Sequence, residues 1–178
     1  MNLELNKKIK DIASIASSKE SDIHKYIKMY KNKIIVIKCG GNIIENKEFF
    51  TFFAKDIKLI KSVGISPIII HGGGPQINTM LNSLGIKSNF LNGLRITDEA
   101  TINIAEMVLS GSINKNIVNK LCREGLKAIG ISGKDCSLIT ASKLKMNFNS
   151  LSKKEKQIKD LGFVGKPVSI NTNFIKYL

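Results

Sequence analysis

The sequence predicts an α/β fold built around a parallel β-sheet. Two β-branched runs, at 34–37 and 67–70, have the length and composition of strands that are buried on both faces. Each run leads into a glycine-rich turn and then into a stretch with helical spacing of its apolar residues. Two strand–glycine–helix units in succession imply a βαβ core with right-handed crossovers.

The segment before this core, residues 3–31, is predicted to be helical. Apolar side chains recur there at the 3.6-residue spacing of an amphipathic helix, with an interruption at Ser17 and Ser18. We assign residues 1–32 to an N-terminal helical arm, and the pattern favours packing on the following domain over a role in oligomerisation. The two apolar stripes consist of Leu5, Ile9, Ile12 and Ala16, and of Ile23, Tyr26, Ile27 and Tyr30.

Glycine and proline mark the ends of two helices inside the core. Gly64 is expected to end a helix over 49–63, and Gly85 to end a helix that carries Pro75 in its first turn. The spacing of the apolar residues predicts one buried face for each helix. These faces comprise Phe49, Phe52, Phe53, Ile57 and Ile60 in the first helix, and Ile77, Met80, Leu81 and Leu84 in the second.

A hairpin and several further elements follow. Asn92-Gly93 lies between two short apolar runs and predicts a two-residue β-turn. A helix over 98–109 is expected to end at Ser110-Gly111, and Ser112 to cap the next one. The remaining expected elements are a third core strand at 128–131, strands at 138–144 and 163–166, an exposed loop at 145–159 and a helix that begins at Asn171.

The composition argues against several classes of protein. The formal net charge is +14, but the lysines are spread along the chain and aromatic residues make up only 6%, so we expect no nucleic-acid partner. The three cysteines form no C-x-x-C pair and the two histidines are far apart, so we expect no metal site. No apolar run approaches the roughly 20 residues of a membrane helix, and the N-terminus lacks a signal-like stretch. We therefore expect a cytoplasmic protein without membrane contact.

The most informative motifs are two glycine-rich turns, at 38–41 (KCGG) and 71–74 (HGGG). Each lies at the carboxyl end of a predicted strand, which is the edge where open α/β sheets bind ligands. Backbone N–H groups at such turns suit an anion, and the ammonium of Lys38 can reach a phosphoryl group held over the glycines. The sequence has no P-loop, dinucleotide or serine-hydrolase motif, so these turns are the leading candidates for a phosphate site.

Several other positions admit two interpretations. Arg95 follows the hairpin turn and can bind a carboxylate with two hydrogen bonds, although an isolated arginine is more commonly a surface residue. Lys134-Asp135 can form a site loop or a polar turn, and the turn is favoured. We expect His71 to fix its loop by hydrogen bonding, and Cys39 to be buried and inert.

Together the motifs resemble those of the acetylglutamate kinases, a family within the amino-acid kinase superfamily. Residues 38–42 resemble the first glycine loop of the superfamily, whereas 71–77 and 92–98 resemble acetylglutamate kinases specifically. The similar segments occur in family order between Lys33 and Phe174. They read KCGGN, HGGGPQI, NGLRITD, EMVLSGSINK, GISGKD and LGFVG.

This resemblance implies a fold and a reaction. The fold would be a three-layer αβα sandwich with a mainly parallel central sheet, in which residues 33–178 supply the acyl-amino-acid-binding portion. The reaction would be phosphorylation of the side-chain carboxylate of N-acetyl-L-glutamate by ATP in arginine biosynthesis, with magnesium carried on the nucleotide. The C-terminal nucleotide-binding half of the family is expected to be absent, so we expect the chain alone to be inactive.

The resemblance also implies roles for individual residues, each carried over from its position in a motif. It implies no metal-binding residue in this chain. The residues are Lys38 for stabilising the phosphoryl group in flight, Gly40 and Gly41 for contact with the phosphates, Gly73 and Gly74 for backbone N–H donation to acetylglutamate, and Arg95 for its α-carboxylate.

Two alternatives stay open beside this interpretation. The chain can belong to another carboxylate or carbamate kinase of the superfamily, although the Asn-Gly-Leu-Arg segment argues against it. It can also be a non-catalytic module that binds acetylglutamate or regulates another protein. The resemblance alone predicts a homo-oligomer, either a dimer or, through the N-terminal helix, a hexamer.

Overall fold

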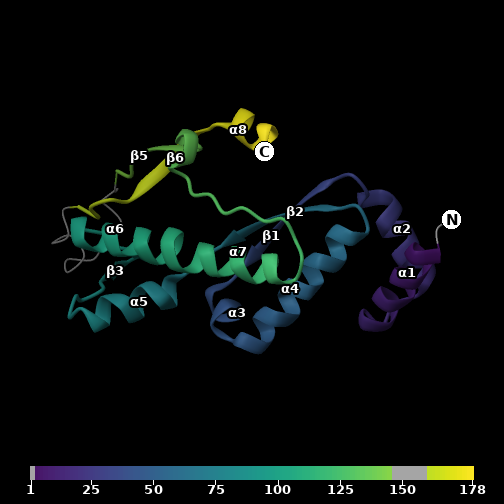
Figure 1. Ribbon diagram of the computed structural model, residues 1–178. Helices are drawn as coiled ribbons and strands as arrows, with labels where there is room; N and C mark the ends of the chain where they lie inside the picture. Colours follow the sequence, from purple (N-terminus) through teal and green to yellow (C-terminus); the bar gives the residue numbers. More distant parts are fainter. Residues whose placement is uncertain (1–2, 146–159) are drawn as a thin grey trace. The chain divides into compact units, whose positions relative to one another are not determined.

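The structure, a computed structural model, describes residues 3–145 and 160–178, with side chains from residue 6 onward. The chain folds as two compact units, and each is considered separately below (Figure 1). The first unit comprises Met1–Gly72 and Ile117–Ala128, and the second comprises Gly73–Asn116 and Ile129–Leu178.

The first unit contains the parallel strand pair that the sequence predicts. β1 (Ile34–Cys39) pairs with β2 (Ser66–His71) in parallel, and Lys38 lies opposite Ile70 in the register. β-branched side chains favour these strands because they pack well on a pleated surface. The α/β class with a parallel sheet is therefore confirmed (Figure 1).

Burial on both faces of these strands, however, is a wrong prediction for this chain. Along β1 the exposure alternates, and Ile34 and Val36 are 64% and 65% exposed. Ile70 on β2 lies on the same face of the pair and is 52% exposed. The opposite face packs within the first unit, where Ile35 contacts the core.

Two helices follow β1 in the chain. α3 (Gly41–Glu45) is a single short turn, and α4 (Lys47–Ser62) then leads back to β2. The side chain of Asn46 caps α4 by accepting backbone N–H groups from the first turn, and Gly64 leaves the helix with φ +88°. The buried face of α4 is rotated from the predicted one, since Phe49 and Phe52 are exposed; its buried residues are Phe50, Ala54 and Ile57.

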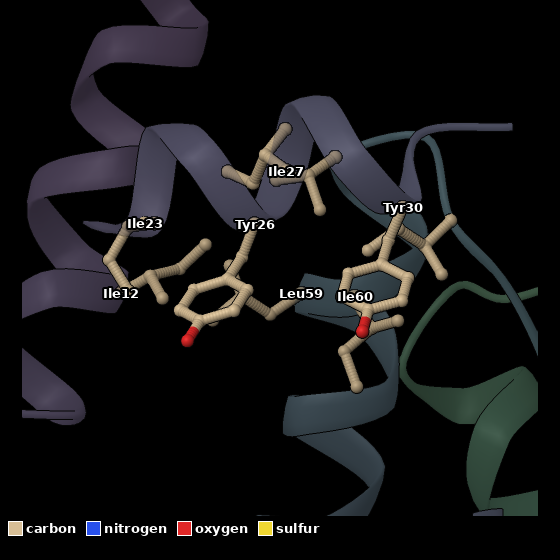
Figure 2. Close-up of a pocket in the computed structure, with 9 residues that line it drawn as sticks. Ile12, Ile23, Tyr26, Ile27, Tyr30, Leu59 and Ile60 are labelled. Atoms are coloured by element: carbon tan, nitrogen blue, oxygen red, sulfur yellow. The ribbon is translucent and has the colours of Figure 1, made fainter. Parts of the chain in front are cut away.

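The N-terminal segment forms two helices, α1 (Leu3–Ile15) and α2 (Glu20–Tyr30). They are separated by a turn in which Ser17 has φ +48°, as the interrupted pattern predicts. Both pack on the unit rather than projecting from it, and α2 directs Tyr26 and Tyr30 towards α4 around a shallow apolar pocket of about 160 Å³ (Figure 2). The shared core consists of Ile9, Ala13, Ile23, Ile27, Val63 and Ile65.

The second unit begins with α5 (Gly74–Ser83) and a hairpin of β3 (Phe90–Leu91) and β4 (Leu94–Arg95). Pro75 lies in the first turn of α5, where its missing N–H has no intrahelical role. Asn92 and Gly93 both have positive φ, which is the type I′ geometry that joins two twisted strands without splaying them. The helix and the hairpin are thus confirmed.

The predicted break at Ser110-Gly111 does not occur. α6 (Glu99–Glu106) continues through a π-helix, η1 (Met107–Ile113), into α7 (Asn114–Arg123). Asp98 caps α6, and its carboxylate accepts the N–H of Thr101 at 2.8 Å. Apart from Asn114, which is also buried, the buried positions advance by three or four residues except for one step of five inside η1; they are Thr101, Ile104, Val108, Ile113, Ile117 and Leu121. That step is the extra residue of a π-helix.

The third core strand, expected at 128–131, is absent from the described residues. Ile129 is 69% exposed, and the segment has no strand partner. Side chains satisfy two of its carbonyl groups instead, since Lys115 Nζ donates to Gly130 O at 3.0 Å and Asn114 Nδ2 to Ile131 O at 3.3 Å. An apolar run alone therefore did not specify a strand here.

The end of the chain forms an antiparallel pair and a helix. After a 3₁₀ turn, η2 (Asp135–Ser137), β5 (Ile139–Lys143) pairs with β6 (Gly165–Ile170), and α8 (Thr172–Tyr177) begins at Asn171 as expected. β6 begins later than the expected 163–166, because the preceding residues bond to other segments. The predicted loop at 145–159 lies almost wholly outside the described residues. Among the helices described, none is long and apolar enough to cross a bilayer.

Candidate functional site

In the first unit the two glycine-rich turns follow the same edge of the sheet. Cys39 and His71 are register partners in parallel strands, so the residues after them, Gly40 and Gly72, both leave the sheet at its carboxyl edge. A hydrogen bond from Gly72 N to Cys39 O, 3.3 Å long, ties the start of the second turn to the first. This meets the central requirement for a shared anion site in open α/β sheets.

Lys38 lies at this edge on the exposed face of β1. A Cβ built on Gly40 or on Gly72 meets no atom within 4 Å, so the backbone beside the lysine is open to a ligand. An ammonium next to open backbone amides suits a phosphoryl group, because both kinds of donor stabilise negative charge. Gly41 begins α3 directly after this turn.

The two other residues at this edge behave as predicted. The Nδ1 atom of His71 lies 3.2 Å from Gly72 O, and with a proton on Nδ1 it donates to that carbonyl. Cys39 is fully buried, and desolvation raises the pKa of its thiol. A buried thiol with a raised pKa is a poor nucleophile, so Cys39 is no candidate for covalent chemistry.

In the second unit, Gly73 precedes α5 and is held in a tight space. A Cβ on Gly73 would lie 2.8 Å from Leu109 Cδ2 and would also collide with Ile113 Cδ1, both on the π-helix η1. Gly74, the first residue of α5, has no atom within 4 Å of such a Cβ. The π-helix thus packs onto the backbone at Gly73, which fixes the start of α5 and leaves Gly74 open.

Arg95 lies on β4 in the second unit and is held by two residues of its own hairpin. Its Nη1 donates to Ser88 Oγ, and its guanidinium carbon lies 4.6 Å from the centre of the Phe90 ring. Partial burial lowers the pKa of the Arg95 guanidinium from its ordinary value, but arginine stays charged at any physiological pH. Arg95 is thus an ordered cation rather than an unattached surface arginine.

The predicted site residues are distributed over both units. Lys38, Gly40 and Gly41 belong to the first unit, and Gly73, Gly74 and Arg95 belong to the second. The division falls inside the second turn, because Gly72 belongs to the first unit and Gly73 to the second.

The alternative loop at Lys134-Asp135 is a polar turn, as favoured. Asp135 accepts hydrogen bonds from Ser132 N and Ser132 Oγ, at 2.5 and 2.9 Å, and closes the turn on itself. Lys134 forms an exposed ion pair with Glu106, 2.5 Å between Nζ and Oε2. Both side chains are thus engaged in local structure.

Sequence reasoning missed the residues that support these groups. Ser88 and Phe90 were not singled out, although a two-residue turn at Asn92-Gly93 already places Phe90 opposite Arg95. The contact of Leu109 and Ile113 with Gly73 has no comparable signal, because it joins segments more than thirty residues apart.

Three aspartates make the stability of the chain depend on pH. Hydrogen bonds from Thr101 lower the pKa of Asp98, those from Ser132 lower that of Asp135, and Lys143 and the backbone of Gly162 lower that of Asp160. Each carboxylate therefore stabilises the fold above the unfolded pKa of about 3.9, and this contribution is lost as the pH falls through the lower folded pKa.

Acidification from pH 5 towards pH 2 is accordingly expected to lower the free energy of unfolding. Asp98→Asn keeps an N-cap residue but cannot titrate, so it should make this pH dependence shallower. Urea unfolding at several pH values measures the effect. Asp56→Asn, at an exposed position of α4, is the matched control. A steeper or unchanged pH dependence for Asp98→Asn would contradict the assignment.

Comparison with known proteins adds sequence relatives to this geometry. The model of the amino acid kinase family matches residues 33–178. The acetylglutamate kinase of Zymomonas mobilis subsp. mobilis is 50% identical over 154 residues, which are 86% of this chain and 51% of the relative. The acetylglutamate kinase of Erythrobacter litoralis is 47% identical over 150 residues, which are 84% and 50% of the two chains. The chain thus spans about half the length of the curated relatives that it matches.

Solved structures also resemble this chain. The structure of smu.665 from Streptococcus mutans has a TM-score of 0.64 at 25% identity, and the alignment covers 81% of this chain and 53% of that one. The N-acetylglutamate synthase of Neisseria gonorrhoeae, complexed with coenzyme A and N-acetyl-glutamate, has a TM-score of 0.66 at 20% identity, covering 86% and 32%. The second likeness concerns the fold alone.

Proposed function

Because this chain belongs to the amino acid kinase family, we propose that it supplies the substrate-binding portion of an enzyme that phosphorylates N-acetyl-L-glutamate. The observation that carries the proposal is the 50% identity over 154 residues to a kinase named for that substrate. The shared carboxyl edge of Lys38, Gly40 and Gly72 supports the same conclusion, because phosphoryl transfer requires fixed donors at one place.

The proposed reaction is a transfer from ATP to a carboxylate. An oxygen of the side-chain carboxylate bonds to the γ-phosphorus while the bond to the ADP oxygen breaks, and the products are an acyl phosphate and ADP. Magnesium carried on ATP would neutralise part of its phosphate charge. The reaction belongs to arginine biosynthesis, in the cytoplasm, and a homo-oligomer is the proposed assembly.

The chain's own residues divide the work between them. Lys38 offsets the charge that develops on the phosphoryl group, and the open backbone at Gly40, with Gly41 at the start of α3, faces the phosphates. Gly73 and Gly74 donate backbone N–H groups to the acetylated amino acid. Arg95 binds its α-carboxylate through paired hydrogen bonds.

Ligand binding to the chain tests this proposal directly. Isothermal titration with N-acetyl-L-glutamate is expected to give saturable binding, and N-acetyl-L-aspartate, one methylene shorter, should bind more weakly. Arg95→Ala should weaken the binding of N-acetyl-L-glutamate, whereas Arg123→Ala, at an exposed position of α7, should leave it unchanged. Equal affinity for both acetylated amino acids would rule out the assigned substrate.

Lys38 is expected to act on turnover rather than on substrate binding. In a chimera that joins this chain to the other half of the Zymomonas mobilis relative, Lys38→Met should lower kcat about 100-fold. The KM for N-acetyl-L-glutamate should change little, because the cation acts mainly on the transferring group. Hydroxylamine trapping of the acyl phosphate measures the rate, and Lys33→Met, just before β1, is the control. A kcat equal to that of the Lys33 variant would remove Lys38 from the reaction.

A further inference from the structure

The guanidinium of Arg95 is held on two sides by its own hairpin. The Phe90 ring covers one face at 4.6 Å, and Ser88 Oγ accepts the hydrogen bond of Nη1. We propose that Ser88 and Phe90 are positioning residues that aim the remaining edge of Arg95, formed by Nε and Nη2, at the α-carboxylate of the substrate. This inference rests on the proposed function of the chain.

The backbone of Arg95 is anchored as firmly as its side chain. Thr97 Oγ1 donates to Arg95 O at 2.9 Å, and Thr97 is itself only 6% exposed. The neighbouring Ile96 N donates to Asn89 O at 2.9 Å, which extends the hairpin ladder by one bond. The backbone of Arg95 is therefore fixed within the second unit. The direction of its guanidinium then depends on the Phe90 ring and the Ser88 hydroxyl, so a change at either can redirect it.

The chemistry of arginine determines which edge remains for a ligand. A guanidinium has five N–H donors in one plane, and Nε with Nη2 forms one of the two-donor edges that match a carboxylate. Within the described residues, neither Nε nor Nη2 makes a hydrogen bond, whereas Nη1 is occupied by Ser88. The ring of Phe90 blocks approach along one face but not in the plane. A carboxylate is thus guided to the Nε–Nη2 edge.

Positioning of this kind raises the affinity for the substrate, because the arginine side chain loses less conformational entropy when the ligand binds. A free arginine side chain loses rotamer freedom when it grips a ligand, whereas one already held in place loses less. The ring–cation contact stays half exposed, since Phe90 is 52% exposed, so its contribution belongs to the weaker end of the range for such contacts. The expected effects are therefore several-fold rather than complete losses.

Titration calorimetry with two ligands separates positioning from general damage to the fold. One ligand is N-acetyl-L-glutamate, and the other is its analogue with a carboxamide in place of the α-carboxylate. Phe90→Leu should weaken the first ligand about threefold to fivefold, and Phe90→Tyr, which keeps the ring, should restore it. Ser88→Ala should weaken it about threefold and Ser88→Thr should restore it. None of these variants should change the affinity for the carboxamide appreciably.

Matched controls exist for both positions. Phe52 on α4 is 53% exposed, close to the value for Phe90, and Phe52→Leu should leave both affinities unchanged. Ser83→Ala removes an exposed hydroxyl that donates to Met80 and should be neutral as well. The Nε–Hε signal of Arg95 in ¹⁵N NMR gives a readout that needs no ligand. It should broaden or shift in Phe90→Leu and not in Phe52→Leu.

The possible outcomes distinguish the two proposals. If the wild type binds N-acetyl-L-glutamate, Arg95→Ala weakens it, and both Phe90→Leu and Ser88→Ala bind normally, the positioning inference is wrong while the proposed function stands. Equal losses for the carboxylate and the carboxamide also overturn the inference, because they indicate a merely structural role. If the wild type does not bind N-acetyl-L-glutamate at all, both proposals fall.

Discussion

Replacing Gly162 with alanine is expected to lower the free energy of unfolding by about 3 kcal/mol, the largest stability effect foreseen for a single substitution in this chain. Gly162 has φ +74°, and a Cβ there would collide with the carbonyl oxygen of Thr97 and lie 2.7 Å from its carbonyl carbon. These are backbone atoms and cannot rotate away. Hydrogen bonds of 2.8 Å from Thr97 N to Leu161 O and 2.7 Å from Phe163 N to Thr97 O hold the two segments at this distance.

A second glycine separates the two sources of this cost. Gly85 has φ +69° but has no atom within 4 Å of a built Cβ, so Gly85→Ala carries backbone strain without a collision. Urea unfolding of both variants should show a cost of about 1 kcal/mol for Gly85→Ala and clearly more for Gly162→Ala. Equal losses in the free energy of unfolding would mean that the backbone segments at Thr97 and Gly162 can move apart easily. The collision would then not be the cause.

Gly73→Ala is expected to lose N-acetyl-L-glutamate binding while reducing stability by about 1 to 2 kcal/mol. The φ of 177° lies outside the left-handed region that favours glycine, so steric contact is the main expected cost. The added methyl group would meet Leu109 and Ile113, and Ile113 is only 3% exposed and has little space to move. The first turn of α5 must shift instead, and this shift would move the backbone N–H groups proposed to hold the substrate.

Two companion variants make this expectation specific. Gly74→Ala adds the same methyl group in open space, so it should retain the stability of the first turn. Ile113→Val removes the Cδ1 atom that the new methyl group would meet, so the double variant Gly73→Ala/Ile113→Val should recover part of the loss. Calorimetric binding and urea unfolding measure the two effects. Strictly additive losses in the double variant would show that the π-helix does not constrain Gly73.

Local signals were sufficient for most elements of the fold. The β-branched runs and the Asn92-Gly93 turn specified β1, β2 and the hairpin, because these signals act over a few residues. Burial of both faces of β1 could not be judged this way, since it depends on what packs against the sheet. Ile34 and Val36 are as β-branched as their half-buried neighbours Ile35 and Ile37, so residue type does not reveal that they are exposed.

The failures in the helical segment have a physical cause. Ser110-Gly111 weakens a helix by about 1 kcal/mol, which is why a helix end was expected there. Burial of Val108 and Ile113 on either side outweighs this cost, and the backbone takes an extra residue instead of stopping. At 128–131 the prediction failed in a different way, because a strand was expected and none forms. It has strand-like composition, but its carbonyl groups bond to the side chains of Asn114 and Lys115 rather than to a neighbouring strand.

The candidate site was only partly within reach of sequence reasoning. The two glycine turns and Arg95 could be predicted from residue type and position in the sequence. The groups that hold them are ordinary serine, phenylalanine, leucine and isoleucine side chains, and only their contacts distinguish them. Phe90 is the exception, because the hairpin register fixes its partner as Arg95.

The five-residue step in η1 constrains how the chain can change in length. Within the second unit, Thr101, Ile104 and Val108 share one helical face with Ile113 only because one residue is added between Val108 and Ile113. Deleting or inserting a single residue in this stretch would turn the following helical turn by about 100° and carry Ile113 out of register with the preceding buried face. Residue identity can vary at the exposed positions of η1, such as Met107 and Gly111, but the number of residues in it cannot.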